Sequence, residues 1–260
     1  MRTSVSVLLA VGLCCVVSVS AANAGTQNVR PLTLDNDDLQ NVFDSVTVGG
    51  TGIDAYNDQS PHSLFTSDAS GGAVATFVIE LAGFASTNQF GLYNRDETSN
   101  KAMIFDGADT ADDMALIQFY ANGDIYVNFA LAATGFSSDF GFYLDVYEAT
   151  GAGGGDDDGT SLDYTLFSED SENAGGTAQA MLYQGDDDTV IQIGGLMPGT
   201  FTDNQYIVAF EDLRIDLGAS ADFTDLVVMV ESITAIPAPA AVLLGLLGLP
   251  MVGWVKRRLA

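Results

Sequence analysis

The sequence predicts an all-β protein, in which residues 25–235 form an antiparallel, jelly-roll-like β-sandwich between an N-terminal signal peptide and a C-terminal transmembrane helix. Three observations predict this architecture. Apolar residues of the central part come in short runs separated by Gly, Asp, Asn and Ser, as in proteins built from many short strands. Helical periodicity is almost absent from these runs. Each end of the chain carries an apolar segment next to basic residues.

Ten segments are predicted to be strands: 73–81, 89–93, 115–120, 125–129, 140–147, 162–167, 178–183, 190–193, 205–213 and 225–233. In residues 125–129, apolar and polar side chains alternate with the period of two that a strand with one buried face shows. The pair Asn122-Gly123 just before this segment favours a tight hairpin turn. One short helix is predicted at residues 35–40.

Residues 1–24 have the three parts of a secretory signal peptide. Arg2 supplies the basic start, residues 5–19 include the apolar stretch, and Ala22-Asn23-Ala24 is a cleavage site of the small-x-small kind. We therefore expect the mature chain to begin at Gly25.

The mature domain is expected to be strongly acidic. It is also expected to lack cysteine, because Cys14 and Cys15 both lie in the signal peptide. Its stability must then come from its core or from bound ions. Its 35 acidic residues stand against four basic ones, a net charge of −31. Such a charge excludes nucleic acid as a partner, whereas cations fit it. With 47% hydrophobic residues, the chain is too apolar to be a disordered acidic segment.

Residues 236–260 combine a proline motif, an apolar segment and a basic tail. The motif is Pro237, Ala238, Pro239 and Ala240, and the tail is Lys256, Arg257 and Arg258. Residues 238–255 are 18 residues without a charge, a helix of about 27 Å that can cross a bilayer core. The tail is expected on the cytoplasmic side. The alternative, a buried core helix, leaves the terminal position and the basic tail unexplained.

This order of parts resembles the PEP-CTERM family of bacterial sorting signals. In that family, a membrane enzyme called exosortase processes the signal during export to the cell surface. The motif here is closer to the Val-Pro-Leu-Pro-Ala variant than to the usual Val-Pro-Glu-Pro. The resemblance implies a chain first anchored in the cell membrane and then located at the cell surface or in the extracellular matrix. It implies an exosortase-type enzyme as a partner and makes exopolysaccharide a further expected partner.

A second resemblance covers about residues 160–232. Its motifs are residues 164–170, Asn173, residues 178–185, residues 205–213 and residues 222–230. They are similar to the bacterial surface domain catalogued as domain of unknown function 4114, which implies an extracellular domain without an established activity. Where the family usually has a further Asp before its Asp-aromatic pair, this chain has Ser220.

Calcium is the cofactor that the acidic, Gly-rich loops favour, because it takes six to eight oxygen ligands from carboxylates and carbonyls. The candidate ligands, which meet if residues 205–213 and 225–233 pair as a hairpin, are Glu211, Asp212, Asp222 and Asp225. Neighbouring side chains of a strand point to opposite faces, so Glu211 and Asp212 cannot both face one ion. One alternative is that these two only solvate a loop or pair with Arg214. Another is that calcium binds at residues 156–158 or 186–188.

No catalytic constellation is evident, and we expect a non-enzymatic protein. A Ser-His-Asp arrangement would need His62, the chain's one histidine, which is expected in a surface turn. Without mature cysteines, zinc or copper centres are not expected. The alternative function is a carbohydrate-binding module or glycoside hydrolase of the cell surface, which exposed aromatic side chains would favour. Fold alone cannot decide between these functions.

The sorting signal generates the first prediction. We expect the C-terminal helix to anchor the chain only until a cut within residues 237–240 releases the mature domain. Mass spectrometry of the protein at the cell surface checks this. Recovery of an intact C-terminal peptide through Arg257 from most surface-located molecules would refute processing, though not anchoring.

Overall fold

The computed structural model describes residues 31–67, 73–80, 87–107, 109, 113–147 and 161–236. The signal peptide with its cleavage site, the sorting signal with its predicted helix, and residues 156–158 lie outside the described residues. Within the described part, no helix is long and apolar enough to cross a membrane.

The described strands pair only in antiparallel fashion and form three sheets, so the prediction of an all-β protein is confirmed. The smallest sheet has the order β1 (Thr47–Gly49), β12 (Val190–Ile191), β13 (Gly199–Thr200). A six-stranded sheet has the order β16 (Ile233–Ala235), β2 (Phe65–Ser67), β9 (Asp139–Val146), β4 (Gln89–Asn94), β5 (Glu97–Asp106), with β10 (Tyr164–Phe167) also pairing with β9.

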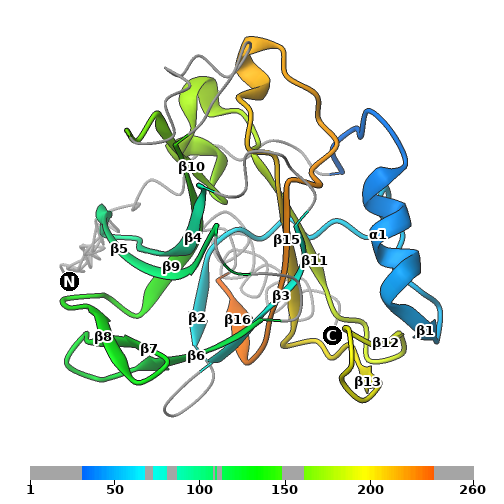
Figure 1. The fold of residues 1–260 in the computed structure, drawn as a ribbon, viewed down its shortest axis with the longest axis horizontal. Helices are drawn as coiled ribbons and strands as arrows, with labels where there is room; N and C mark the ends of the chain where they lie inside the picture. The colour runs from blue at the N-terminus through cyan, green and yellow to red at the C-terminus, as the bar shows by residue number, and fades with distance from the viewer. Residues whose placement is uncertain are drawn as a thin grey trace, which may run out of the picture.

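The seven-stranded sheet has the order β11 (Ala180–Gln184), β14 (Tyr206–Phe210), β15 (Leu226–Val230), β3 (Ala73–Glu80), β6 (Met114–Phe119), β7 (Ile125–Val127), β8 (Ala130–Ala133). One α-helix, α1 (Asp38–Val46), lies beside this sheet in Figure 1. The 3-10 helices are η2 (Asp170–Glu172), η3 (Ala174–Gly176) and η4 (Ile215–Leu217).

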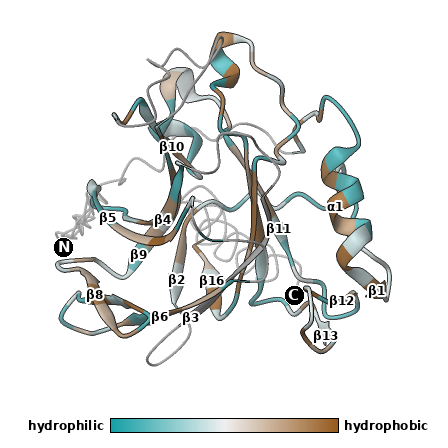
Figure 2. Cartoon of the chain, viewed as in Figure 1, coloured by the Kyte–Doolittle hydropathy of each residue, from teal (hydrophilic) through white to brown (hydrophobic). Residues whose placement is uncertain are grey.

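The two large sheets share one hydrophobic core. Aromatic contacts join them: the ring of Phe65 on β2 lies 4.8 Å from that of Tyr206 on β14, and Phe90 on β4 lies 6.1 Å from Phe210 on β14. Hydrophobic residues follow the strands, and hydrophilic residues follow many of the connecting loops (Figure 2). Apolar burial of this kind is the main favourable contribution to folding, and the described residues contain no cysteine that could add a disulfide.

A second core covers the opposite face of β11, β14 and β15 with α1 and the smallest sheet. Within it, the rings of Phe43 and Tyr183 meet edge to face, with centroids 4.6 Å apart. All five residues of β14 and all five of β15 are buried. Burial on both faces explains why these strands are continuous apolar runs rather than alternating ones. Polar residues of this part of the sheet are therefore confined to the ends of the strands.

The predicted hairpin at Asn122-Gly123 is confirmed, since β6 and β7 pair and Gly123 has a φ of +84°. The strand predicted at residues 125–129 is shorter than expected and ends at Val127. Asn128 and Phe129 have φ values of +50° and +68° and turn the chain into β8. The strand prediction failed there because alternation of side chains does not reveal left-handed backbone.

The helix predicted at residues 35–40 is placed wrongly, because α1 begins at Asp38 and continues to Val46. Its buried side chains follow the spacing of one helical face: Leu39, Val42, Phe43 and Val46. The sequence pattern predicts no strand at β5 or β8. β5 is rich in polar residues and β8 in alanine, and both owe their extended form to pairing with neighbours.

Candidate metal centre

The candidate centre lies in the connection between β14 and β15. These strands pair with Phe210 opposite Leu226, which confirms the hairpin on which the predicted site depends. Glu211 and Asp212 follow the last residue of β14, and Asp225 precedes the first residue of β15. The most buried strand pair therefore brings the two ends of a carboxylate-rich connection together.

Three of the four predicted ligands form a compact group. Carboxylate oxygens of Glu211, Asp222 and Asp225 all lie within 4.8 Å of one another. Glu211 is buried, with 3% of its surface exposed, and the two aspartates are half-buried. It is the one group of this kind that the described residues contain. Oxygen atoms at this spacing can bind a single cation.

Backbone and hydroxyl donors orient these carboxylates. Phe223 N donates to Glu211 Oε2 over 3.4 Å, and Asp212 N donates to Asp225 Oδ2 over 2.7 Å. Asp222 Oδ1 accepts from the hydroxyl of Thr224 over 2.9 Å. These contacts place each side chain without occupying all of its oxygen lone pairs, which leaves acceptor capacity for a ligand.

Asp212 is not in the compact group, in agreement with the prediction that neighbouring residues diverge. Its Oδ2 accepts a hydrogen bond from Asn88 Nδ2 over 3.0 Å. Asn88 Oδ1, in contrast, is buried and has no hydrogen-bond partner among the described residues. Sequence reasoning missed Asn88, because 124 positions separate it from Asp212 and only packing brings the two together.

Burial raises the pKa of Glu211, Asp212 and Asp225 above the ordinary carboxyl range. For Glu211 and Asp212, the neighbouring charge of Asp225 raises the pKa further. The described residues offer no ion pair to these groups, and Arg214 pairs with Asp216 over 2.6 Å. Arg214 therefore does not pair with Glu211 or Asp212, and both of these side chains are buried.

Ser220, the departure from the resembled family, belongs to the loop that carries the centre. Its Oγ lies 3.3 Å from Asp222 Oδ2 and 3.4 Å from Asp35 Oδ2. Asp35 also accepts a hydrogen bond from Ala221 N over 2.8 Å. These contacts hold the loop against the segment that leads into α1. The hydroxyl of Ser220 thus supplies a hydrogen bond at the position where an Asp would supply a charge.

The alternative site at residues 186–188 has a different structural role. Asp186 Oδ1 accepts from the backbone of Asp188 and Thr189 over 2.9 and 2.7 Å. Asp188 Oδ2 accepts from Thr51 N over 3.0 Å. Partial burial raises the pKa of Asp186, but the donors from Thr189, Asp188 and Thr51 outweigh it and lower the pKa to about 2. These carboxylates fasten one loop to another, so we do not assign a metal to them.

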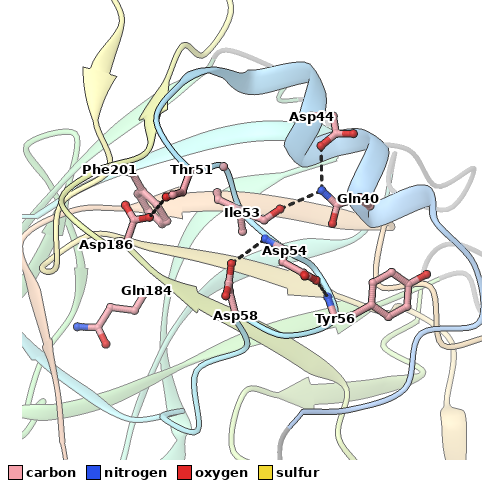
Figure 3. Close-up of a pocket in the computed structure, with 12 residues that line it drawn as sticks. Gln40, Asp44, Thr51, Ile53, Asp54, Tyr56, Asp58, Gln184, Asp186 and Phe201 are labelled. Carbon is pink, nitrogen blue, oxygen red and sulfur yellow. Dashed lines mark hydrogen bonds between the residues drawn. The ribbon is translucent and has the colours of Figure 1, made fainter.

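An open cavity of about 770 Å³ lies between α1 and the loops below it (Figure 3). Its lining includes Asp54, Asp58 and Asp186. Asp58 Oδ2 accepts from Asp54 N over 2.8 Å, and Asp54 Oδ2 accepts from Asn57 over 2.7 Å. The acidic side chains of the cavity accept hydrogen bonds from the loops that line it, and we assign no ligand to the cavity.

The raised pKa values generate a prediction about pH. Protonation of the cluster stabilises the folded state. This contribution is complete below the pKa of about 4 that a carboxyl has in the unfolded chain, and it is lost as pH rises through the raised pKa values of the folded state. With a chelator present, Asp225→Asn should therefore lose less stability than the wild type between about pH 5 and pH 8. We expect a difference of at least about 1.4 kcal/mol, the free energy of one pKa unit.

Chemical denaturation at several pH values measures this difference. Asp203→Asn, which removes an exposed charge elsewhere, is the control for the general repulsion among carboxylates and should follow the wild type. Equal pH dependence in all three proteins would show that the cluster does not titrate as described.

Comparisons of the chain with protein families, with curated proteins and with solved structures found no match. The two family resemblances therefore stay predictions.

Proposed function

We propose that this chain is an exported, non-enzymatic protein of the cell surface or extracellular matrix, sorted by an exosortase-type system and stabilised by calcium. The signal-peptide pattern of residues 1–24 and the motif, apolar segment and basic tail of residues 236–260 support export and sorting. The helix of residues 238–255 would hold the chain in the membrane before processing.

We also propose that the domain is a jelly-roll-like β-sandwich. Two antiparallel sheets of six and seven strands that share one hydrophobic core support this description. The connection between β14 and β15 then lies at one end of the sandwich. Connections at such ends are common positions for binding residues, because the sheets hold them in place.

The observation that carries the calcium proposal is the group of three carboxylates within 4.8 Å, without a basic partner among the described residues. Like charges at this distance repel, and partial burial strengthens the repulsion. A divalent cation removes it, whereas pairing with a proton removes only one charge at a time. Three carboxylates favour a hard cation over zinc, which prefers nitrogen and sulfur ligands.

Calcium should stabilise the protein more than magnesium does. Magnesium requires near-ideal octahedral geometry and releases its water reluctantly, whereas a loop of this kind adapts to calcium. If only the folded state binds, calcium at 100 times its Kd adds about 2.7 kcal/mol to the free energy of unfolding. Thermal melts of the purified protein in calcium and in magnesium of matched ionic strength measure the effect.

Two double variants give this experiment its controls. Asp222→Asn with Asp225→Asn should lose the calcium-specific rise in Tm. Asp96→Asn with Asp203→Asn removes the same charge from exposed positions and should keep it. Equal Tm values in the two ions would show only charge screening. A calcium-specific rise that survives the first double variant would place the site elsewhere.

One observation favours the second candidate function, carbohydrate binding, over the glycosidase alternative. Tyr120 is 51% exposed and its ring lies 5.1 Å from that of Tyr126, while Phe129 at the nearby turn is 73% exposed. Residues 125–138 carry no charge. Exposed rings are suited to stacking against a neutral sugar, and exposed apolar patches mark binding sites.

A glycan array tests this candidate, with and without calcium. Binding of a neutral glycan should be lost in Tyr120→Ala and kept in Leu217→Ala, which changes an exposed residue far from the pair in sequence. Equal binding by both variants would show that Tyr120 does not contribute to glycan binding. No binding by the wild type would leave exopolysaccharide without support as a partner.

A further inference from the structure

Asp212 is the predicted ligand that the compact group leaves out. It is 1% exposed. Among the described residues, the basic side chains form their ion pairs elsewhere: Arg95 with Glu169, Lys101 with Asp145, and Arg214 with Asp216. A carboxylate this deeply buried needs either a proton or a cation beside it.

Asn88 supplies an independent observation at the same place. Its side chain is 8% exposed, and its Oδ1 has no hydrogen-bond partner among the described residues. Leaving such a buried oxygen without a donor is unfavourable. Asn88 Nδ2 donates to Asp212 Oδ2 over 3.0 Å, so the carboxamide of Asn88 lies beside the Asp212 carboxylate. An amide oxygen next to a carboxylate is a typical pair of calcium ligands.

Asp225 connects this pair to the compact group. Its Oδ2 accepts from Asp212 N over 2.7 Å, and its carboxyl interacts with those of both Glu211 and Asp212. A carboxylate has two oxygens with about four lone-pair sites. One side chain can therefore contribute to two neighbouring cation positions.

The charge of the four carboxylates also favours a second cation. When ionised, Glu211, Asp212, Asp222 and Asp225 carry four negative charges, of which one Ca²⁺ balances two. The remaining two would stay in a largely buried place without an ion pair, a costly arrangement. A second Ca²⁺ would bring the group to neutrality.

We propose that a second Ca²⁺ binds between Asp212 and Asn88, with Asp225 shared between the two ions. This inference rests on the proposed calcium site at Glu211, Asp222 and Asp225. Asn88 directly precedes β4 of the six-stranded sheet, whereas Asp212 follows β14 of the seven-stranded sheet. The second ion therefore cross-links the two large sheets at one end of the molecule, in a mature chain that has no cysteine for a disulfide.

The number of bound ions tests the proposal directly. Equilibrium dialysis of the full chain in non-ionic detergent should give two tightly bound Ca²⁺ per chain, measured in enough NaCl to screen the weak surface sites. Asn88→Ala should reduce the number to one. Asn88→Asp should keep two, because a carboxylate oxygen replaces the amide oxygen.

Asn173→Ala is the matched control. Asn173 is another buried asparagine, but its Oδ1 and Nδ2 are both hydrogen-bonded to the backbone of Phe167 over 2.8 Å. Its removal should lower stability and leave two ions bound. If Asn88→Ala does not fold, Asp212→Asn replaces it and should also bind one ion fewer than the wild type.

The outcomes separate this inference from the function on which it rests. One ion in the wild type, unchanged in Asn88→Ala, overturns the second position and leaves the first intact, with Asp212 keeping a proton. Two ions in both proteins place the second ion elsewhere. No tightly bound ion in the wild type overturns the second position together with the calcium proposal.

Discussion

Burial of both faces of β14 and β15 is the constraint on which the rest of the structure depends. One face contributes to the core shared by the two large sheets, and the other packs under α1 and the smallest sheet. Strands in this position have no exposed face for polar residues. Their polar residues therefore gather where the strands end, which is how Glu211 and Asp225 become neighbours at the rim of the core.

Neighbouring carboxylates at the rim of a core create an electrostatic cost that the fold does not remove by itself. Arg214 is only two positions from Asp212, yet it pairs with Asp216 and leaves the cluster to repel itself. The protein as a whole has the same difficulty, with a net charge of −27. Divalent cations would reduce the repulsion both in the cluster and over the whole protein. The proposed calcium centre would then act as a structural cross-link.

The surface that carries the exposed ring of Tyr120 differs from the candidate metal centre in burial. It lies on the hairpin of β6 and β7, at the far side of the seven-stranded sheet from β14 in strand order. The proposed ion site and the proposed glycan site therefore lie on different strands of this sheet and need separate measurements.

The sequence by itself determined the all-β class and the hairpin at Asn122-Gly123, because these follow from local patterns. The pairing that places Glu211 near Asp225 was only a condition of the predicted site, and the tertiary structure met it. Partners distant in sequence decide the exact span of α1, the strands β5 and β8, and the hydrogen bonds of Thr51 with Asp186 and Asp188. Only the tertiary structure decided which carboxylates are buried and that Asn88 lies against Asp212. Burial is a property of packing, and no spacing along the chain encodes a contact across 124 positions.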